Sequence, residues 1–167
     1  VGSYDPNDAI FLEGPLISAS QAQDFVNIRL RFQNTGTASA ININVETILE
    51  TDLDWSTIQP LYASHAYTAS ITNGNHVRFS FLDINLADSA SDEPNSHGFV
   101  VFRIKPINTF AQGDLAETQA NIYFDYNLPI ITNIATTQID NSLHTNDFNY
   151  DYQIGLYPNP TTEHISI

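Results

Sequence analysis

The sequence contains no cysteine, no methionine and only five basic residues among its 167. Without cysteine there can be no disulfide, no thiolate nucleophile and no cysteine-ligated zinc. No segment approaches the roughly 20 consecutive apolar residues of a membrane-spanning helix, so membrane insertion is not expected. Because methionine is absent and the first residue is Val1, we expect the chain to be an internal or processed piece of a longer polypeptide.

The charge balance is strongly acidic. Nineteen acidic residues against five basic ones give a formal net charge of −14. Such a field repels the phosphates of nucleic acids and anionic membrane surfaces, so no nucleic acid is expected as a partner. High acidity can accompany disorder, but a hydrophobic content of 42%, with ten Phe and eight Tyr, favours a packed fold. The length suits one domain with a genuine core.

Alternation of apolar and polar residues, the signature of half-buried strands, runs through most of the sequence. It predicts strands over 24–33, 41–45, 67–72, 76–82, 99–105, 118–125 and 133–139, with a shorter one near 10–12. Asn73-Gly74-Asn75 predicts a hairpin turn because Asn and Gly tolerate positive φ, and Val77, Phe79 and Phe81 should then face inward. No stretch shows helical periodicity. The prediction is an all-β fold, an antiparallel immunoglobulin-like β-sandwich.

Several segments add a family resemblance. Arg31 to Ala38, with Asn34-Thr35-Gly36-Thr37 at its centre, is similar to the Asn-Thr-Gly-Thr repeats of immunoglobulin-like domains in bacterial surface proteins. Gly2–Asp8, Glu93–Val100 and Ile122–Asn133 look like the conserved-repeat family that precedes type IX sorting domains. The resemblance extends from Gly2 to about Ile139 and implies fold and location rather than activity. Ala9 stands where that family usually has Lys.

The last twelve residues carry a second resemblance. Leu156-Tyr157-Pro158-Asn159-Pro160, followed by the alternating His164–Ile167, resembles the opening strand of a type A sorting domain of the type IX secretion system of Bacteroidota. This implies that Tyr157, Pro158, Asn159 and Pro160 are the sorting signal, that the type IX machinery is a partner, and that the protein is secreted or on the outer cell surface. The alternative is an ordinary proline-rich turn before a last strand.

These features divide the chain into three expected parts. Residues 1–139 form the sandwich, 140–153 an Asn/Asp-rich linker, and 154–167 the start of a truncated sorting domain.

Clustered oxygen-bearing side chains suggest a calcium site. Asp5, Asn7 and Asp8 lie within four residues around Pro6, and calcium prefers several hard oxygen ligands supplied by loops. The acidic loop with Asp88, Asp92 and Glu93 is a weaker candidate, as is Asp125 with Asn127. The complete calcium-loop spacing is absent, so side-chain-capped turns are the favoured alternative.

Signals for catalysis are weak. The five histidines never stand at the spacing of a paired zinc motif; they are His65, His76, His97, His144 and His164. Ser96-His97 places a hydroxyl beside an imidazole, but no nucleophile elbow is present, and we expect His97 to hydrogen-bond backbone in a turn. No catalytic residue is therefore predicted, and the chain is not expected to be an enzyme.

Two sets of residues could contact a ligand. Trp55, expected in a loop, is either a core plug or, with Tyr62 and Tyr67, a platform for sugar rings. All five cations fall at outward positions of predicted strands; they are Arg29, Arg31, Arg78, Arg103 and Lys105. Either they pair with acids such as Glu46, or they form a basic face, with Arg103 and Lys105, for an anionic glycan or a neighbouring domain.

The sequence therefore predicts a non-catalytic, secreted or cell-surface spacer that joins an upstream domain of the same polypeptide to a type IX sorting signal. The alternative is a carbohydrate-binding module of a secreted polysaccharide-degrading enzyme.

Overall fold

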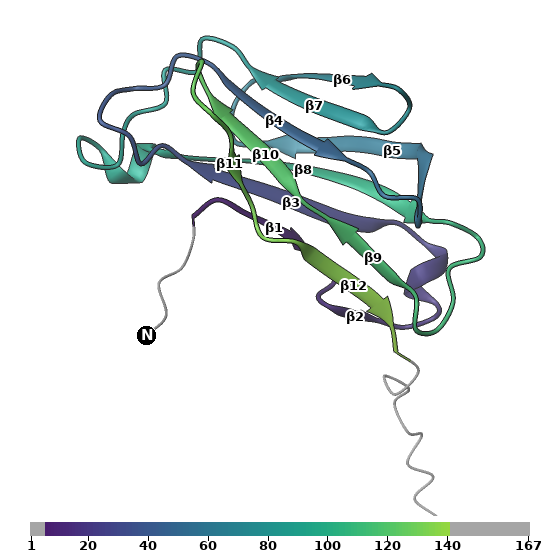
Figure 1. Cartoon of the computed structure of the whole chain (residues 1–167). Helices are drawn as coiled ribbons and strands as arrows, with labels where there is room; N and C mark the ends of the chain where they lie inside the picture. Colours follow the sequence, from purple (N-terminus) through teal and green to yellow (C-terminus); the bar gives the residue numbers. More distant parts are fainter. Residues whose placement is uncertain (1–5, 141–167) are drawn as a thin grey trace, which may run out of the picture.

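The computed structural model describes residues 6–140 and shows two β-sheets packed face to face, with a small third sheet beside them (Figure 1). The first sheet has the order β1 (Asp8–Phe11), β3 (Val26–Gln33), β8 (His97–Pro106), β5 (Leu53–Ala63). The second has the order β11 (Ile130–Ile131), β10 (Ala120–Phe124), β4 (Ile43–Ile48), β7 (His76–Phe81), β6 (Thr68–Thr72). The third consists of β2 (Leu16–Ile17), β12 (Ala135–Ile139) and β9 (Leu115–Thr118), and two 3-10 turns, η1 (Gln21–Gln23) and η2 (Glu93–Asn95), interrupt the loops. Every pair is antiparallel except β2 with β12.

The predicted all-β sandwich is confirmed, and its core follows the alternation of the sequence. On β3 every second side chain is buried, and Val77, Phe79 and Phe81 of β7 face it from the other sheet, as expected. The ring centroids of Phe79 and Phe102 lie 5.6 Å apart, and those of Phe32 and Phe81 lie 5.1 Å apart. Burial of each such ring contributes about 1.5–3 kcal/mol, so these inter-sheet contacts hold the two layers together.

The hairpin between β6 and β7 is also confirmed. Asn73 and Gly74 have φ values of 56° and 81°. Only residues that tolerate the left-handed region make this turn cheaply, which is the reason for Asn-Gly at this point.

One predicted strand is wrong in detail. The segment 118–125 reads as one strand, but β9 ends at Thr118 and β10 begins at Ala120. Thr118 pairs with Ala135 of the third sheet, whereas Ala120 pairs with Thr47 of the second. The chain changes sheets at Gln119 without losing its alternation, so the pattern alone could not show the break.

The prediction that Trp55 lies in a loop is wrong. Trp55 belongs to β5, an edge strand of 11 residues. Its pairing with β8 shifts register between Asp54 and Gln59 and again between Pro60 and Tyr62. Because of these irregularities, and because Pro60 is tolerated only in an edge strand, the sequence of β5 does not alternate regularly between apolar and polar residues.

The first and last strands run side by side in the same direction. Asn133, just before β12, bonds both backbone groups of Ala9: its Oδ1 accepts from the Ala9 N–H and its Nδ2 donates to the Ala9 carbonyl, each at 3.0 Å. Further along, Ile139 pairs with Ile17. β1 begins at one end of the sandwich, and β12 begins near the tip of β1 and finishes toward the other end (Figure 1). Because a strand advances about 3.3 Å per residue, the entry and the exit of the described chain are about 20 Å or more apart.

Within residues 6–140, no helix has the length and apolar character needed to cross a membrane.

Candidate functional site

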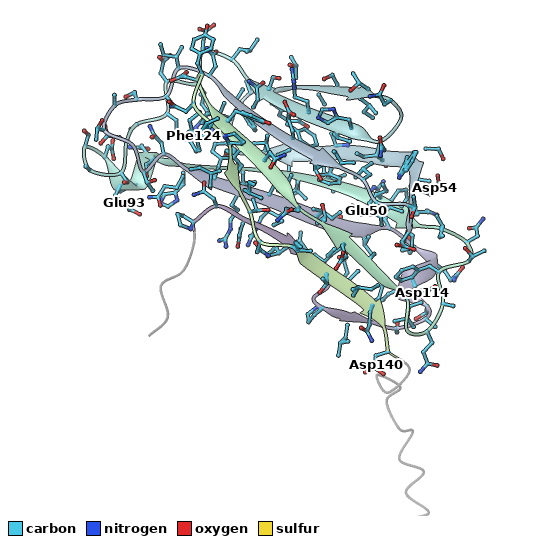
Figure 2. All side chains as sticks on the ribbon, viewed as in Figure 1. Glu50, Asp54, Glu93, Asp114, Phe124 and Asp140 are labelled. Carbon is cyan, nitrogen blue, oxygen red and sulfur yellow. The ribbon has the colours of Figure 1, made fainter. Side chains whose placement is uncertain are left out.

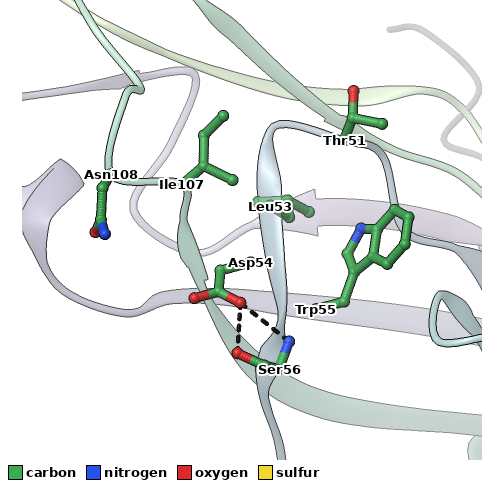
Figure 3. Close-up of a pocket in the computed structure, with 7 residues that line it drawn as sticks. All are labelled: Thr51, Leu53, Asp54, Trp55, Ser56, Ile107 and Asn108. Atoms are coloured by element: carbon green, nitrogen blue, oxygen red, sulfur yellow. Dashed lines mark hydrogen bonds between the residues drawn. The ribbon is translucent and has the colours of Figure 1, made fainter.

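A groove on the described chain lies beside Trp55 (Figure 3). It measures about 550 Å³ and lies at the end of the sandwich where β5 begins; its lining consists of Thr51, Leu53, Asp54, Trp55, Ser56, Ile107 and Asn108. The Trp55 indole is half-buried against the core, and its Nε1 donates to the Glu50 carbonyl at 2.9 Å. Trp55 is thus neither the full core plug nor the free platform that the sequence left as alternatives.

Two polar side chains of this groove, Asp54 and Ser56, are already paired with each other. The Asp54 carboxylate accepts hydrogen bonds from the Ser56 N–H at 3.1 Å and the Ser56 hydroxyl at 2.6 Å (Figure 3). The Thr57 hydroxyl donates to the Asp54 carbonyl and accepts from the Lys105 N–H. Among the described residues, no second carboxylate and no histidine line the groove. The arrangement can hold a small ligand with one apolar face, but it lacks the paired groups that acid–base chemistry requires.

The two tyrosines do not extend the groove. Tyr62 is 55% exposed on the outside of β5, where its ring meets Phe99 edge-on with centroids 6.1 Å apart. Tyr67 turns toward the core, and its ring lies 5.9 Å from those of Phe79 and Phe81. The structure therefore does not bring the three aromatic candidates onto one face.

Four of the five cations lie on one sheet. Arg29 and Arg31 belong to β3 and Arg103 and Lys105 to β8, whereas Arg78 belongs to β7 of the other sheet. Two of the cations are paired with acids: Arg31 forms an ion pair with Asp8, and Arg78 lies 2.6 Å from Glu46.

Arg103 and Lys105 make a different contact, because both lie over the Phe25 ring, at 4.3 and 4.9 Å from its centroid. Arg103 also donates twice to the Gln59 amide oxygen. Cross-strand pairing, which the sequence favoured, accounts for part of this face, and cation–π contacts account for another part.

Most of the calcium candidates that the structure describes make side-chain hydrogen bonds within the chain, while Asp5 lies outside the described residues. Asn7 is buried and its Oδ1 accepts from the Gln33 N–H at 3.0 Å. Asp125 accepts from the Ile41 and Asn42 N–H groups, at 3.0 and 2.8 Å. Asp92 accepts from Asn95 at 2.8 Å.

These candidates do not form a metal cluster. Figure 2 labels one of them, Glu93, at one end of the sandwich. No group of three or more His, Asp or Glu side chains within residues 6–140 is placed to hold a metal ion. Calcium binding stays a prediction from the sequence.

Asp88 is a structural acid rather than a free ligand. It is 5% exposed and accepts hydrogen bonds from the Ala90 and Ser91 N–H groups, at 3.2 and 2.9 Å. The side-chain hydrogen bond from Ser91 and these backbone bonds lower the pKa of Asp88 below its ordinary value, against a smaller opposing effect of burial. A lowered pKa means that the ionised form stabilises the fold at neutral pH, and that this contribution is lost as the pH falls through the lowered value.

The expectation for His97 is wrong. Its Nε2 lies 2.8 Å from a Glu93 carboxylate oxygen and 3.2 Å from the Gln33 amide nitrogen, so it bonds side chains at the start of β8 rather than backbone in a turn. The Ser96 hydroxyl donates to the Glu93 carbonyl at 2.7 Å and accepts from Gln33. The hydroxyl and the imidazole are thus engaged separately and do not form a nucleophile–base pair.

Sequence reasoning missed two amides that organise the fold. Asn133 joins the first strand to the start of the last, as described above. Asn34 is 5% exposed and its Nδ2 donates to the carbonyls of Ala38 and Leu86, at 2.9 and 3.0 Å. Its Oδ1 accepts from the Gly36 N–H at 3.0 Å. Both residues stand in segments that carried the family resemblance, but only coordinates reveal which distant strands they join.

A family model described as "Domain of unknown function (DUF7619)" matches residues 5–138. No curated protein matches the chain in sequence.

Solved structures share the fold. The full-length major pilin SpaD from Corynebacterium diphtheriae aligns with a TM-score of 0.56 and 16% identity, covering 79% of this chain and 35% of the pilin. The major pilin subunit BcpA of Bacillus cereus aligns with a TM-score of 0.56 and 13% identity, covering 79% of this chain and 39% of the pilin. ACE19, the collagen-binding subdomain of the Enterococcus faecalis surface protein ACE, aligns with a TM-score of 0.50 and 11% identity, covering 83% and 99%. This chain therefore spans little more than a third of either pilin. At these identities the likeness shows an immunoglobulin-like fold and nothing finer.

Proposed function

The chain belongs to the DUF7619 family, and we propose that its domain is a non-catalytic β-sandwich spacer of a secreted or cell-surface protein. It joins an upstream domain of the same polypeptide to a C-terminal segment that carries a sorting signal. The surface pilins and the surface adhesin that share the fold support the coarse part of this proposal.

The observation that carries the proposal is the placement of entry and exit at opposite ends of the sandwich. Where the chain enters and leaves a domain on the same side, the domains before and after it are brought close together. Where the chain enters at one end and leaves at the other, those two domains are held apart. The described chain enters before β1 and leaves after β12, and these strands run in the same direction (Figure 1). This geometry suits a tether between a functional domain and an anchoring or export segment.

The same arrangement suits a domain under load. A pull on the two ends drags β1 against β3 and β12 against β9, along the strands rather than across them. When two paired strands are pulled along their length, the backbone hydrogen bonds between them bear the force together. They do not break one after another. The Asn133 amide adds two bonds between the Ala9 backbone and the start of the last strand.

The sorting function rests on the sequence alone. The resemblance of Leu156–Ile167 to a type A sorting domain supports export by the type IX machinery of a Bacteroidota bacterium. These residues, including Tyr157, Pro158, Asn159 and Pro160, lie outside the described part of the chain, as does nearly all of the expected linker.

The second candidate is a carbohydrate-binding module, which the Trp55 groove favours. A half-exposed indole edge beside hydroxyl and amide groups is a surface on which a sugar ring can stack. Tyr67, by contrast, contacts core rings on the inner side of the sheets.

Retention on a panel of neutral and sulfated polysaccharides separates the two candidates. The spacer proposal predicts no retention by any of them. It also predicts that Trp55→Ala lowers the free energy of unfolding by about 1–2 kcal/mol, less than the 3–5 kcal/mol of a fully buried Trp, because the ring is half-buried.

Tyr62→Ala, which removes an exposed ring outside the groove, is the matched control and should change stability by about 0.5 kcal/mol or less. Retention on one polysaccharide that Trp55→Ala abolishes and Tyr62→Ala preserves would replace the spacer by the carbohydrate-binding module.

A further inference from the structure

The two edge strands β5 and β6 carry a single acidic residue, Asp54 near the start of β5. β5 is an edge strand of the first sheet and β6 an edge strand of the second, and both lie on the same side of the molecule (Figure 1). From Trp55 to Leu82 the sequence has no Asp or Glu, although the whole chain has 19. The side of the molecule formed by 55–82 therefore has little negative charge, so another acidic molecule would meet less repulsion there than over the rest of the chain.

β6 has none of the features that block strand pairing at a sheet edge. All five of its residues are exposed, and none is charged or a proline; its sequence is Thr68-Ala69-Ser70-Ile71-Thr72. Charged side chains, prolines and bulges are the usual protection of an edge strand. The register with β7 is regular from Thr68 to Thr72, so the outer edge of β6 presents an unbroken row of backbone groups.

β6 also leaves apolar surface uncovered. Ile71 pairs with Val77 and Ala69 with Phe79, whose side chains are buried in the core. Ile71 is nevertheless 47% exposed because the second sheet ends at its strand. A further strand along β6 would cover this side chain and continue the core past the present edge.

We propose that β6 pairs with β6 of a second copy of this chain, antiparallel and about a two-fold axis at Ser70. The sequence of the strand is self-complementary in this register: Thr68 lies opposite Thr72, Ala69 opposite Ile71, and Ser70 opposite Ser70. No charges face each other, and the two five-stranded sheets become one continuous sheet.

The self-complementary register of Thr68–Thr72 favours a second copy as the occupant, and the distribution of charge permits it at this edge. Two copies, each with a formal charge of −14, repel through every acidic surface. The nearest acid across the strands from Ser70 is Glu46, which lies beyond β7 and is paired with Arg78 and His76, at 2.6 and 3.0 Å. Contact through β6 therefore keeps the unpaired acids of both copies at a distance.

Sedimentation of the full chain over a range of concentrations up to about 1 mM tests the proposal. It should show a monomer–dimer equilibrium that shifts toward the dimer as salt rises, because screening removes the repulsion between the acidic bodies. Ser70→Lys should raise the dissociation constant by about tenfold or more, since two ammonium groups then face each other across the axis. Ser39→Lys, with the same charge change at an exposed loop residue, should not raise it.

Cross-linking locates the axis, because the chain has no cysteine of its own. Opposite residues of an antiparallel pair have Cα atoms about 4.5–5.5 Å apart, within the reach of about 4.4–6.8 Å for a disulfide. Mild oxidation of Ser70→Cys should give a covalent dimer in high yield, and Ser39→Cys should not. A chain that is monomeric at every concentration, a dimer that salt dissociates, or equal cross-linking by the two variants would overturn the proposal.

Discussion

Replacing Gly98 by alanine is expected to lower the free energy of unfolding by about 3 kcal/mol or more, the upper end of the range for overpacked cores. A Cβ at Gly98 would lie 2.2 and 2.3 Å from two ring atoms of Phe32, its cross-strand partner. That ring is 1% exposed and packs edge-on against Phe81 and Phe124, so it has no free space to enter. Urea unfolding should show a lower midpoint with an unchanged slope.

Two variants identify the cause as a collision of side chains. Gly113→Ala changes a glycine with φ of +91° and no atom within 4 Å of the added methyl, so only backbone strain of about 1–2 kcal/mol is expected. Phe32→Leu in the Gly98→Ala background should recover part of the loss, although the same change alone destabilises the wild type. A loss below about 1 kcal/mol for Gly98→Ala, or no recovery in the double variant, would contradict the packing described for β3 and β8.

Asn34→Ala is expected to cost about 2–3 kcal/mol, because a buried amide with three side-chain hydrogen bonds is removed at about 1 kcal/mol each and leaves a small void. Asn34→Asp keeps the shape and the acceptor for Gly36, but it places a carboxylate beside the carbonyls of Ala38 and Leu86. It should therefore be at least as damaging as the alanine variant.

Asn95 supplies the comparison for this amide. Its Nδ2 donates to Asp92 at 2.8 Å on the surface, so Asn95→Ala should change stability by about 0.5 kcal/mol or less. Equal effects of Asn34→Ala and Asn95→Ala in thermal and urea unfolding would show that Asn34 does not hold the loops of 34–40 and 86–96 together.

The sequence alone predicted the elements that have one buried face and short turns. β3 and β7 alternate buried and less buried residues, and Asn73-Gly74 marks the hairpin that joins β6 to β7. The bounds of β3 and β7 were therefore predicted within one or two residues. β5 escaped prediction because its pairing is irregular and only one of its 11 residues is buried. The sheet change at Gln119 escaped for the opposite reason, since the alternation continues through it.

The site was less predictable than the fold. Trp55 lines the groove, but the residues beside it there, such as Ile107 and Asn108, come from the loop after β8, and the sequence did not point to them. Cations were correctly placed on strands, yet which of them would meet an acid depended on sheet order: Arg78 meets Glu46 because β7 neighbours β4. Register and sheet order depend on how all the strands pack together, and the alternation within one segment does not specify them.

Unfolding under force, with the chain held at its two ends, tests the spacer account most directly. Cysteines added at the termini give unique handles because the chain has none. Residues 6–140 should unfold in one step that releases about 430 Å, given about 3.4 Å per extended residue and the separation already present in the fold. The unfolding force reports the barrier along the loaded strands rather than the overall stability.

The decisive comparison is between Asn133→Ala and Trp55→Ala. Asn133 joins the loaded β1 to the start of β12, whereas Trp55 lies on β5, away from both ends of the chain. The account predicts that Asn133→Ala clearly lowers the unfolding force, and that Trp55→Ala leaves the force close to that of the wild type even though it loses thermal stability. Equal forces for Asn133→Ala and the wild type, or a larger drop for Trp55→Ala, would contradict a domain built to carry load from its entry to its exit.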